Sequence, residues 1–463
     1  MSNQSDNQGF SPSNDIVEQR TSTEQIEDTL STRVATYCIL FMQGLCTVLP
    51  WNIFITGYEF FHHEFKGSSY ENNFQNYFSV IFMATQLIFL IPAIMTQSKD
   101  WLYRRIFINV SIVSLVFLCL AIFPHFEPSG LAPEIKFFLM LIPLILCGIL
   151  GVFSITDVYG LASMFPPIYI QGVMIGQALG GIAVSLIQLS VTLSNFDNEV
   201  PSTDLEKEMA ILSRAKAYFG VALIVALCTL GSLVVLPRLS TYRRYVLTGA
   251  ELAPPVEKDG LTIEISSLKN KLQRIGLAFR QVRLLALAVI LNFAVTLGIF
   301  PSITSAVTPV SPSASPLYQS LFVPVHFVIF NLGDFIGRLI LGFSLLRLRR
   351  PATVLAMSSL RAVFFLVFLT SHLDLGSQEL SQRFPVWVSD DTLYYFFLFL
   401  FSVSSGYIGS GSMVLAPSLA SSKEDIPLIG NVMAFSLTTG LAIGSFLSFA
   451  LRAAVCDCNS FLS

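Results

Sequence analysis

Apolar residues in this chain form long, nearly unbroken runs, without the strict alternation of a half-buried strand. Each run is about 20 residues long, the length that a helix needs to cross the hydrocarbon core of a bilayer. Charged residues, prolines and glycines separate the runs, which predicts an all-α polytopic membrane protein. The eleven predicted spans are roughly 33–57, 74–97, 106–123, 137–161, 168–193, 217–236, 284–305, 319–346, 351–371, 392–415 and 427–452.

The composition excludes most classes of soluble protein. Of the 463 residues, 53% are hydrophobic and 12% are charged, whereas a soluble domain carries about 25% charged residues. Nucleic-acid-binding proteins, secreted disulfide scaffolds and cytosolic enzymes are therefore excluded, and the lipid bilayer is the expected environment. The sequence also lacks the G-x-x-x-x-G-K-[ST] loop that binds ATP, so we expect no cofactor and no ATP-driven transport.

A polar segment at 237–283 divides the predicted spans into two groups. We interpret it as a cytosolic linker loop between an N-terminal bundle of six spans, 33–236, and a C-terminal bundle of five, 284–455. Residues 1–32 are polar and acidic and are predicted to form a disordered cytosolic tail, and 456–463 a short C-terminal tail. Two bundles of this kind, as in major-facilitator-like transporters, hold the substrate between them and expose it alternately to each side.

Basic residues concentrate on one side of this predicted topology. The segments that share the side of the N-terminus hold eighteen of the 27 Lys and Arg residues, against seven on the opposite side. Short cytoplasmic loops are enriched in Lys and Arg, so we predict a cytosolic N-terminus. Because the number of spans is odd, the C-terminus is predicted to be extracytosolic.

Asp334 and Arg338 lie within the eighth predicted span, at positions i and i+4 on one helix face, and Asn331 shares that face. Ionisable groups inside a span are costly and normally face the protein interior or a water-filled cavity. A carboxylate, a guanidinium and an amide together offer the donors and acceptors that a polyhydroxylated or heterocyclic ligand requires. We therefore predict a binding role, with pinning of this span to its neighbours as the structural alternative.

Two further charges lie inside predicted spans. Asp157, in the fourth span, has no basic residue at i±3 or i±4, so it must be protonated, face water or meet a partner from another helix. It is a candidate selectivity or proton site, with an interhelical hydrogen bond as the alternative. Arg361, in the ninth span, is interpreted as structural, with a long stem that reaches the cytoplasmic interface.

Other functional classes fit the sequence less well. It holds no H-E-x-x-H motif or similar set of catalytic residues or metal ligands, which disfavours an intramembrane enzyme and a metal site. A twelve-span sugar or drug carrier would share the two-bundle layout but not the odd number of spans. An ion channel is disfavoured because the intramembrane acid Asp334 stands beside an arginine, and a receptor would bind ligand without moving it.

Several sequence blocks resemble the equilibrative nucleoside transporter family. The first span contains GLCTVLPWNIFIT, with the P-W-N motif that opens this family. The further blocks, in chain order, are YGLASMFPPIYIQGVMIGQALGG, LPRLSTYRRY, LGIFPSIT, FNLGDFIGRLI, SSGYIGS and GLAIGSFLSFALRAAV. Together the blocks extend from residue 44 to residue 455. The predicted eleven-span layout with a cytosolic N-terminus agrees with that of the family.

The resemblance implies a uniporter, a solute carrier that moves nucleosides, and in some members nucleobases, down their gradients by alternating access. It implies that Asp334 and Arg338 hold the ribose hydroxyls, with Asn331 on the same wall. The other residues that it implies around the substrate are Trp51, Met83, Leu441 and Val48. Purine and pyrimidine nucleosides are then the expected substrates of a monomeric carrier. The N-terminal tail lacks an obvious dileucine cluster, which favours the plasma membrane over endosomal or lysosomal membranes.

Two positions depart from the family pattern. Many nucleoside-selective members carry a Gln in the fourth span, where this chain has Ile155. Gln86, in the second span, occupies a position that is apolar in well-known members, and its amide is a candidate replacement contact to the base. We hypothesise that Gln86 and Asp157 together set selectivity. The alternative function is a proton-assisted or broad-specificity carrier of nucleosides or organic cations.

Overall fold

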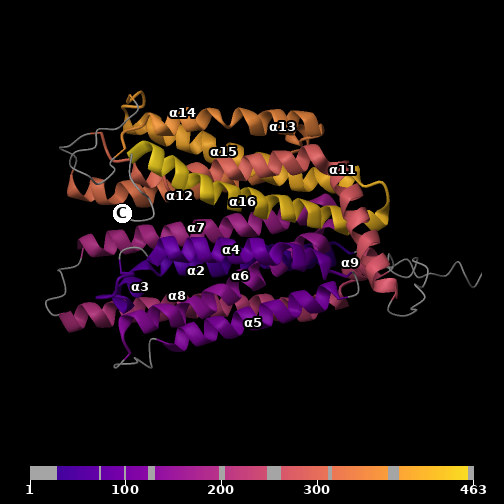
Figure 1. Ribbon diagram of the computed structural model, residues 1–463, viewed down its shortest axis with the longest axis horizontal. Helices are drawn as coiled ribbons and strands as arrows, with labels where there is room; N and C mark the ends of the chain where they lie inside the picture. Colours follow the sequence, from indigo (N-terminus) through magenta and orange to yellow (C-terminus); the bar gives the residue numbers. More distant parts are fainter. Residues whose placement is uncertain are drawn as a thin grey trace, which may run out of the picture.

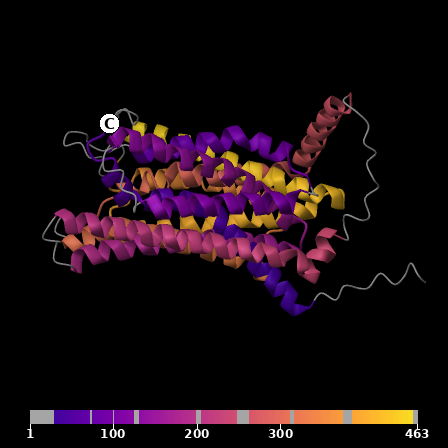
Figure 2. The same cartoon turned by 90° about the horizontal axis from the view of Figure 1, so that it is seen from below.

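The computed structural model describes residues 29–71, 74–98, 101–123, 131–197, 204–247, 262–310, 315–373 and 385–456. Within these residues eleven helices are long and apolar enough to cross a membrane, which confirms the predicted number of spans. They run roughly along one common axis in two perpendicular views (Figures 1 and 2). An odd number of crossings places the start of the first span and the end of the last on opposite sides, and which side faces the cytosol stays a prediction.

The first six spans form the N-terminal bundle. They are α2 (Leu30–Thr56), α4 (Phe74–Met95), α5 (Leu102–Ile122), α6 (Pro133–Ser163), α7 (Pro167–Asp197) and α8 (Asp204–Val235), with a short α3 (Tyr58–Glu64) after α2. The predicted break between the fourth and fifth spans is confirmed, because α6 ends at Ser163 and α7 begins at Pro167. A proline at the first helical turn needs no backbone donor, which suits it to this position.

The remaining spans form the C-terminal bundle. They are α11 (Thr262–Ile299), α12 (Pro316–Ile340), the broken pair α13 (Pro351–Leu360) and α14 (Val363–Leu369), α15 (Asp391–Leu415) and α16 (Ile426–Cys456). Short connecting turns are Leu236–Arg238, α9 (Ser240–Tyr242), Arg243–Leu247, Thr304–Ala306, Ser344–Leu346, Ala416–Leu419 and Lys423–Asp425. In Figure 1 this bundle, orange to yellow, lies above the indigo and magenta N-terminal bundle.

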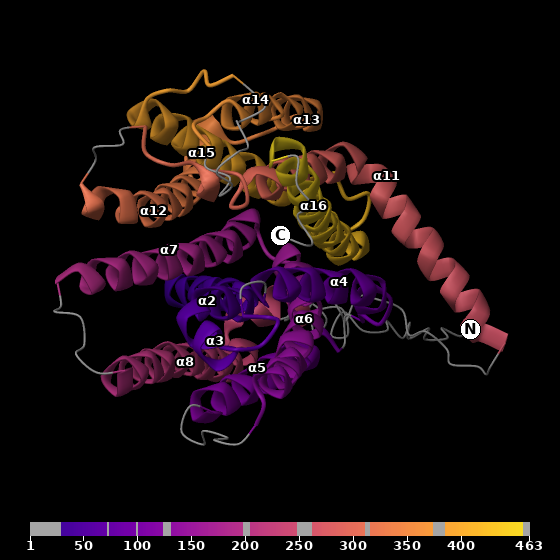
Figure 3. The ribbon, with the colours of Figure 1, turned by 60° about the vertical axis from the view of Figure 1, so that its left-hand side comes forward.

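The seventh span begins much earlier than the sequence predicts. Helix α11 starts at Thr262 rather than at 284, and its first turns project from the bundle in Figure 3. The predicted linker loop at 237–283 is therefore too long, because 262–283 is helical. Apolar runs locate the part of a helix that lies in the bilayer, whereas charged turns outside the bilayer continue the same helix without an apolar signal.

Helix α5 also begins earlier than predicted, at Leu102 rather than at 106. Arg104 and Arg105 therefore belong to the helix and not to the loop before it. This matters for the interior, because the side chain of Arg105 turns inward and is only 16% exposed.

Glycines let two helices of the N-terminal bundle pack with their backbones in contact. A Cβ atom on Gly44 of α2 would collide with the backbone of Val173 on α7, and one on Gly176 of α7 would collide with the carbonyl of Phe41 on α2. Close approach of this kind is how small residues hold membrane helices together in the absence of a hydrophobic driving force. Helix α7 is therefore fixed to α2 and moves with the N-terminal bundle.

Arg361 lies inside the C-terminal bundle and not at the interface to which we expected its stem to reach. It is 2% exposed and stands at the break between α13 and α14. Its guanidinium donates to the Asn292 carbonyl at 2.8 Å, to Thr296 Oγ1 at 2.8 Å, to Ser404 Oγ at 3.1 Å and to the Phe401 carbonyl at 3.1 Å. The structure agrees with a structural role for Arg361, but the prediction that its side chain reaches the membrane interface is wrong. The neighbouring helices α11 and α15 supply enough hydrogen-bond acceptors inside the bundle.

The two bundles meet along a small number of helices. Helix α12 packs against α7, and α16 packs against α6 and α4. Figure 3 shows α12 lying above α7 at this junction. In a carrier that works by rocking one bundle against the other, these are the contacts that must rearrange.

The glycine packing predicts a stability effect. Replacing Gly176→Ala should lower the stability of the protein by about 1–3 kcal/mol, because the new methyl group overlaps the Phe41 carbonyl and must push α2 and α7 apart. Gly220→Ala is the matched control, since a Cβ at Gly220 of α8 meets open space. Thermal melting of the detergent-solubilised protein checks this, and equal melting temperatures for the two variants would contradict it.

Candidate functional site

The structure forms the ion pair that the sequence predicts on α12. Ser315 caps this helix, because its side-chain oxygen accepts a hydrogen bond from the backbone N–H of Tyr318. Asp334 and Arg338 lie one turn apart on the inner face of the same helix. Arg338 Nε donates to Asp334 Oδ2 at 2.7 Å, and the two residues are 8% and 9% exposed. The charges are therefore paired with each other inside the protein, as their burial requires.

Arg338 also reaches across the boundary between the bundles. Its Nη1 donates to the carbonyl of Met174 on α7 at 2.7 Å, and its own carbonyl accepts from Gln171 Nε2 at 3.2 Å. Asp334 Oδ1 and Arg338 Nη2 have no hydrogen-bond partner among the described residues. One acceptor atom and one donor atom of this buried, charged pair are thus without a protein partner among the described residues, at the junction of the two bundles.

Asn331 lies on the same helix but is engaged elsewhere. Its Nδ2 donates to the carbonyl of Phe327 at 2.9 Å, and its side chain fills the space opposite Gly181 of α7. It therefore contributes to the boundary between the bundles one turn from the ion pair, rather than to the pair itself.

Aromatic and apolar candidates gather on the N-terminal bundle. The ring of Trp51 on α2 lies 4.9 Å from that of Phe82 on α4, and Met83 belongs to the same core cluster. Val48, one turn before Trp51, faces Gly180 of α7. The structure therefore places Trp51 and Met83 at the same core cluster of the N-terminal bundle.

Leu441 is placed apart from these residues. It lies on α16 of the C-terminal bundle, half-buried and packed against a different core cluster. A ligand that touches both Leu441 and Trp51 would have to lie between the bundles.

Gln86 lies where its amide faces the neighbouring helix. A Cβ built on Gly151 of α6 would be 3.2 Å from Gln86 Nε2, so the absence of a side chain at Gly151 leaves room for this amide. Ile155 follows one turn later on α6. The side chain of Gln86 thus approaches α6 near Ile155, and it is half-buried rather than sealed in the core.

Asp157 has a charged partner that local spacing does not reveal. Arg105 of α5 donates to it twice, from Nε to Oδ2 at 2.7 Å and from Nη2 to Oδ1 at 2.5 Å. Gln97 Nε2 donates to Oδ1 at 3.1 Å, and the oxygen of the Gln97 amide accepts from Asn431 of α16. Of the three alternatives left open by the sequence, the structure gives a partner from another helix.

This network changes the interpretation of Asp157. The residue is 0% exposed, and both carboxylate oxygens are used by Arg105 and Gln97. Asp157 is therefore part of a polar cluster that joins α5, α6 and the segment just after α4, and that touches α16. The role in selectivity or proton exchange stays a prediction.

Sequence reasoning missed the residues that act through tertiary contact. The predicted spans place Arg105 in a loop, Asn431 lies outside every family block, and Gln171 and Met174 lie within one block that gives them no role. A signal was available for Arg105 alone, because an unpaired acid inside a span requires a cation and this arginine opens the adjacent span. Nothing in the sequence points to the main-chain carbonyl of Met174.

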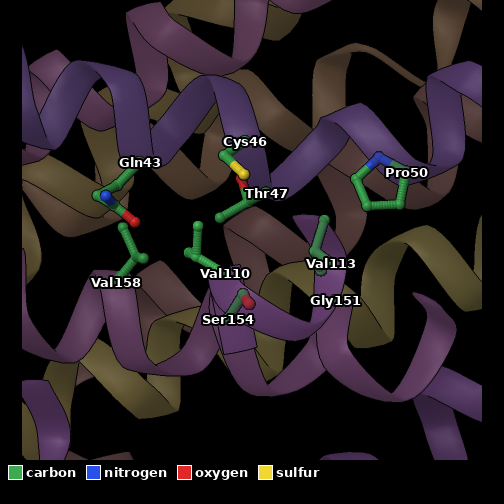
Figure 4. Close-up of a pocket in the computed structure, with 9 residues that line it drawn as sticks. All are labelled: Gln43, Cys46, Thr47, Pro50, Val110, Val113, Gly151, Ser154 and Val158. Atoms are coloured by element: carbon green, nitrogen blue, oxygen red, sulfur yellow. The ribbon is translucent and has the colours of Figure 1, made fainter. Parts of the chain in front are cut away.

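A small cavity inside the N-terminal bundle is not the ligand site. Figure 4 shows it lined by Gln43, Cys46, Thr47, Pro50, Val110, Val113, Gly151, Ser154 and Val158. Its volume of about 10 Å³ leaves room for about one water. Sites for drug-sized ligands measure about 300–1,000 Å³, so this cavity is too small to hold such a ligand.

Comparison with known proteins gives a family and a fold. A family model described as nucleoside transporter matches residues 141–453. The chain is 26% identical to human equilibrative nucleoside transporter 1, with 91% of this chain and 97% of that protein covered. It is 27% identical to rat equilibrative nucleoside transporter 2, with 89% and 96% covered.

Solved structures of major facilitator superfamily proteins share the architecture. The proton:xylose symporter XylE superposes with a TM-score of 0.54 at 12% identity, covering 93% of this chain and 90% of that one. The transporter FucP in its outward conformation gives 0.50 at 14% identity, covering 90% and 98%. At these identities the likeness establishes the fold alone, a two-bundle major-facilitator-like helical protein.

The Asp157 network predicts a loss of stability. Asp157→Asn should lower stability by about 3 kcal/mol, because it leaves the Arg105 guanidinium in the interior without a counter-charge. The double variant Asp157→Asn with Arg105→Gln should recover part of that loss, because it removes both charges. Thermal melting and membrane expression of the three proteins check this, and a single variant as stable as the parent chain would contradict it.

Proposed function

This chain belongs to the nucleoside transporter family, and from that premise we propose that it carries purine and pyrimidine nucleosides across a membrane by facilitated diffusion. The substrate binds between the six-helix and five-helix bundles and is exposed alternately to each side. The observation that carries this proposal is the Asp334–Arg338 pair, which keeps one acceptor and one donor free at the junction of the bundles.

The ion pair suits the sugar of a nucleoside. Vicinal ribose hydroxyls both donate and accept, so Asp334 Oδ1 can accept from one while Arg338 Nη2 donates to the other. Hydrogen bonds to charged groups are the strong ones. Asn331 borders this region on α12, and Trp51, Met83, Val48 and Leu441 provide the apolar and aromatic surfaces on either side of the base.

Gln86 is the proposed reader of the base. Its amide offers both a donor and an acceptor, as the edges of purines and pyrimidines require. The side chain is half-buried and lies against Gly151, near the position of Ile155. A single amide that can turn either way supports a carrier that accepts both classes of base.

Uniport fits the charges better than proton-assisted transport. Proton-coupled carriers commonly use an intramembrane carboxylate that exchanges its proton during the cycle. Asp157 and Asp334, the two acids deep within the described spans, are each held by an arginine. We further propose that the carrier acts as a monomer, because one chain supplies both walls of the site, and that it works in the plasma membrane, since the N-terminal tail lacks an obvious dileucine cluster.

Transport by reconstituted vesicles tests the function. We expect uptake of radiolabelled adenosine and uridine without a proton gradient and without competition from a hexose. Uptake that requires the gradient would contradict uniport, and the absence of nucleoside uptake would contradict the proposal as a whole.

Variants of the ion pair test the site itself. Arg338→Ala should abolish nucleoside uptake, and Asp334→Ala should lower adenosine uptake about 10- to 100-fold, the loss expected for hydrogen bonds to a charged group. Adenine, which lacks the sugar, should lose less. Uptake and membrane expression must be measured together. Loss of expression in proportion to uptake would mean that the pair is only structural.

Replacement of Gln86 tests base recognition. Gln86→Leu keeps the volume but removes the amide, so we expect the ratio of adenosine to uridine uptake to change by about threefold or more, the effect of a single neutral hydrogen bond. Gln188→Leu, at an exposed position of α7, is the control and should leave the ratio unchanged. An unchanged ratio in Gln86→Leu would remove this residue from the site.

A further inference from the structure

A chain of buried polar contacts leads away from Arg338 into the N-terminal bundle. The carbonyl of Met174 accepts from Arg338 Nη1 at 2.7 Å, and the sulfur of Met174 is touched by the hydroxyl of Tyr159 on α6. The same hydroxyl donates to Gln177 Oε1 at 3.0 Å. Gln177 Nε2 in turn donates to Thr47 Oγ1 on α2 at 3.1 Å. Four helices, α12, α7, α6 and α2, are thereby joined at one turn of α7.

This turn of α7 is held at three points, two on α2 and one on α6. Gly44 of α2 packs directly on the backbone of Val173, and Gln177 is bonded to Thr47 of the same helix. Tyr159 holds the side chain of Met174 from α6. Tyr159 and Met174 are 1% and 0% exposed, so water does not substitute for a lost contact. The Met174 carbonyl is therefore a fixed feature of the N-terminal bundle.

Within this chain of contacts, the hydrogen bond from Arg338 to the Met174 carbonyl is the one that joins the C-terminal bundle to the N-terminal bundle. A helical carbonyl already accepts from the amide four residues on, and its second lone pair remains for another donor. Arg338 belongs to the C-terminal bundle, so rocking one bundle against the other separates its guanidinium from Met174. The bond therefore stabilises the conformer seen here against its alternate.

We propose that Tyr159 is a positioning residue that sets the balance between the two conformers of the carrier. By holding Met174 under Arg338, its hydroxyl favours the present conformer without touching the substrate. The inference rests on the proposed function, because it requires that Arg338, the proposed sugar ligand, also stabilises one conformer of a carrier that alternates between two. Arg338 engages Met174 through Nη1 and keeps Nη2 for ligand, so its two tasks use different nitrogens.

The kinetic consequence differs from that of a lost binding group. A ligand binds from a given side with an apparent constant equal to its intrinsic constant divided by the fraction of carrier open to that side. Weakening the present conformer therefore raises KM on the side to which it opens and lowers KM on the other side. Simple damage to the fold lowers the maximal rate and leaves the ratio of the two KM values unchanged.

The test is Tyr159→Phe, with adenosine uptake and efflux measured in vesicles of known orientation. The loss of one buried hydrogen bond should change the ratio of the two KM values by about two- to tenfold. Tyr394→Phe is the matched control. Tyr394 is as buried, at 2% exposed, and its hydroxyl donates to the Thr304 carbonyl at 3.0 Å within a single bundle, so the ratio should stay that of the parent chain.

Gln177→Met provides a second route to the same result. It cuts the link to Thr47 and to Tyr159, and it should shift the ratio in the same direction even if Tyr159→Phe folds poorly. An unchanged ratio in a folded variant, or an equal shift in Tyr394→Phe, would overturn the role of Tyr159. The parent chain separates the two proposals, because its failure to transport adenosine would refute the proposed function, whereas normal transport with an unshifted ratio refutes this inference alone.

Discussion

The arrangement of the two bundles depends on the guanidinium of Arg338, which makes hydrogen bonds to both of them. Inside a bilayer a charge must be paired and its donors satisfied, because water is not there to replace a missing partner. Arg338 meets most of this need with Asp334 on its own helix and with the Met174 carbonyl on the opposite bundle, and among its three nitrogens only Nη2 has no partner among the described residues. Arg338 thus links the proposed ligand site to the boundary that must open during transport. A change at the site is therefore expected to alter the boundary, and a change at the boundary to alter the site.

The three deeply placed arginines are accommodated in different ways. Arg105 has a two-point ion pair with Asp157 across adjacent helices, and Arg338 has a local pair within one helix. Arg361 has no carboxylate among its described partners and relies on carbonyl, amide and hydroxyl oxygens of α11 and α15. Neutral acceptors hold a guanidinium in place but do not cancel its charge. The described interior of the C-terminal bundle therefore holds two arginines, Arg338 and Arg361, but one paired carboxylate, Asp334, which we assign to the sugar.

Helices contact one another both within a bundle and across the boundary between the bundles. Within the N-terminal bundle, Gly44 and Gly176 bring α2 and α7 into backbone contact, which forms a rigid unit. Between the bundles, α12 packs on α7 and α16 packs on α6 and α4, and a few hydrogen bonds cross, from Arg338 to Met174, from Gln171 to the Arg338 carbonyl and from Asn431 to Gln97. Such bonds are individually modest, so they fix one arrangement while leaving another within reach. Rigid halves joined by a few replaceable bonds are what alternating access requires.

The sequence alone determined those features that depend on neighbours along the chain. Apolar runs located the eleven spans, the breaks between the runs separated α6 from α7, and a spacing of four residues placed Asp334 and Arg338 on one helix face. The tertiary structure decided the partners of Asp157 and Arg361, the crossing from Arg338 to Met174 and the early start of α11. The reason is physical, because helical periodicity says which residues share a face, whereas only packing says which helix that face meets.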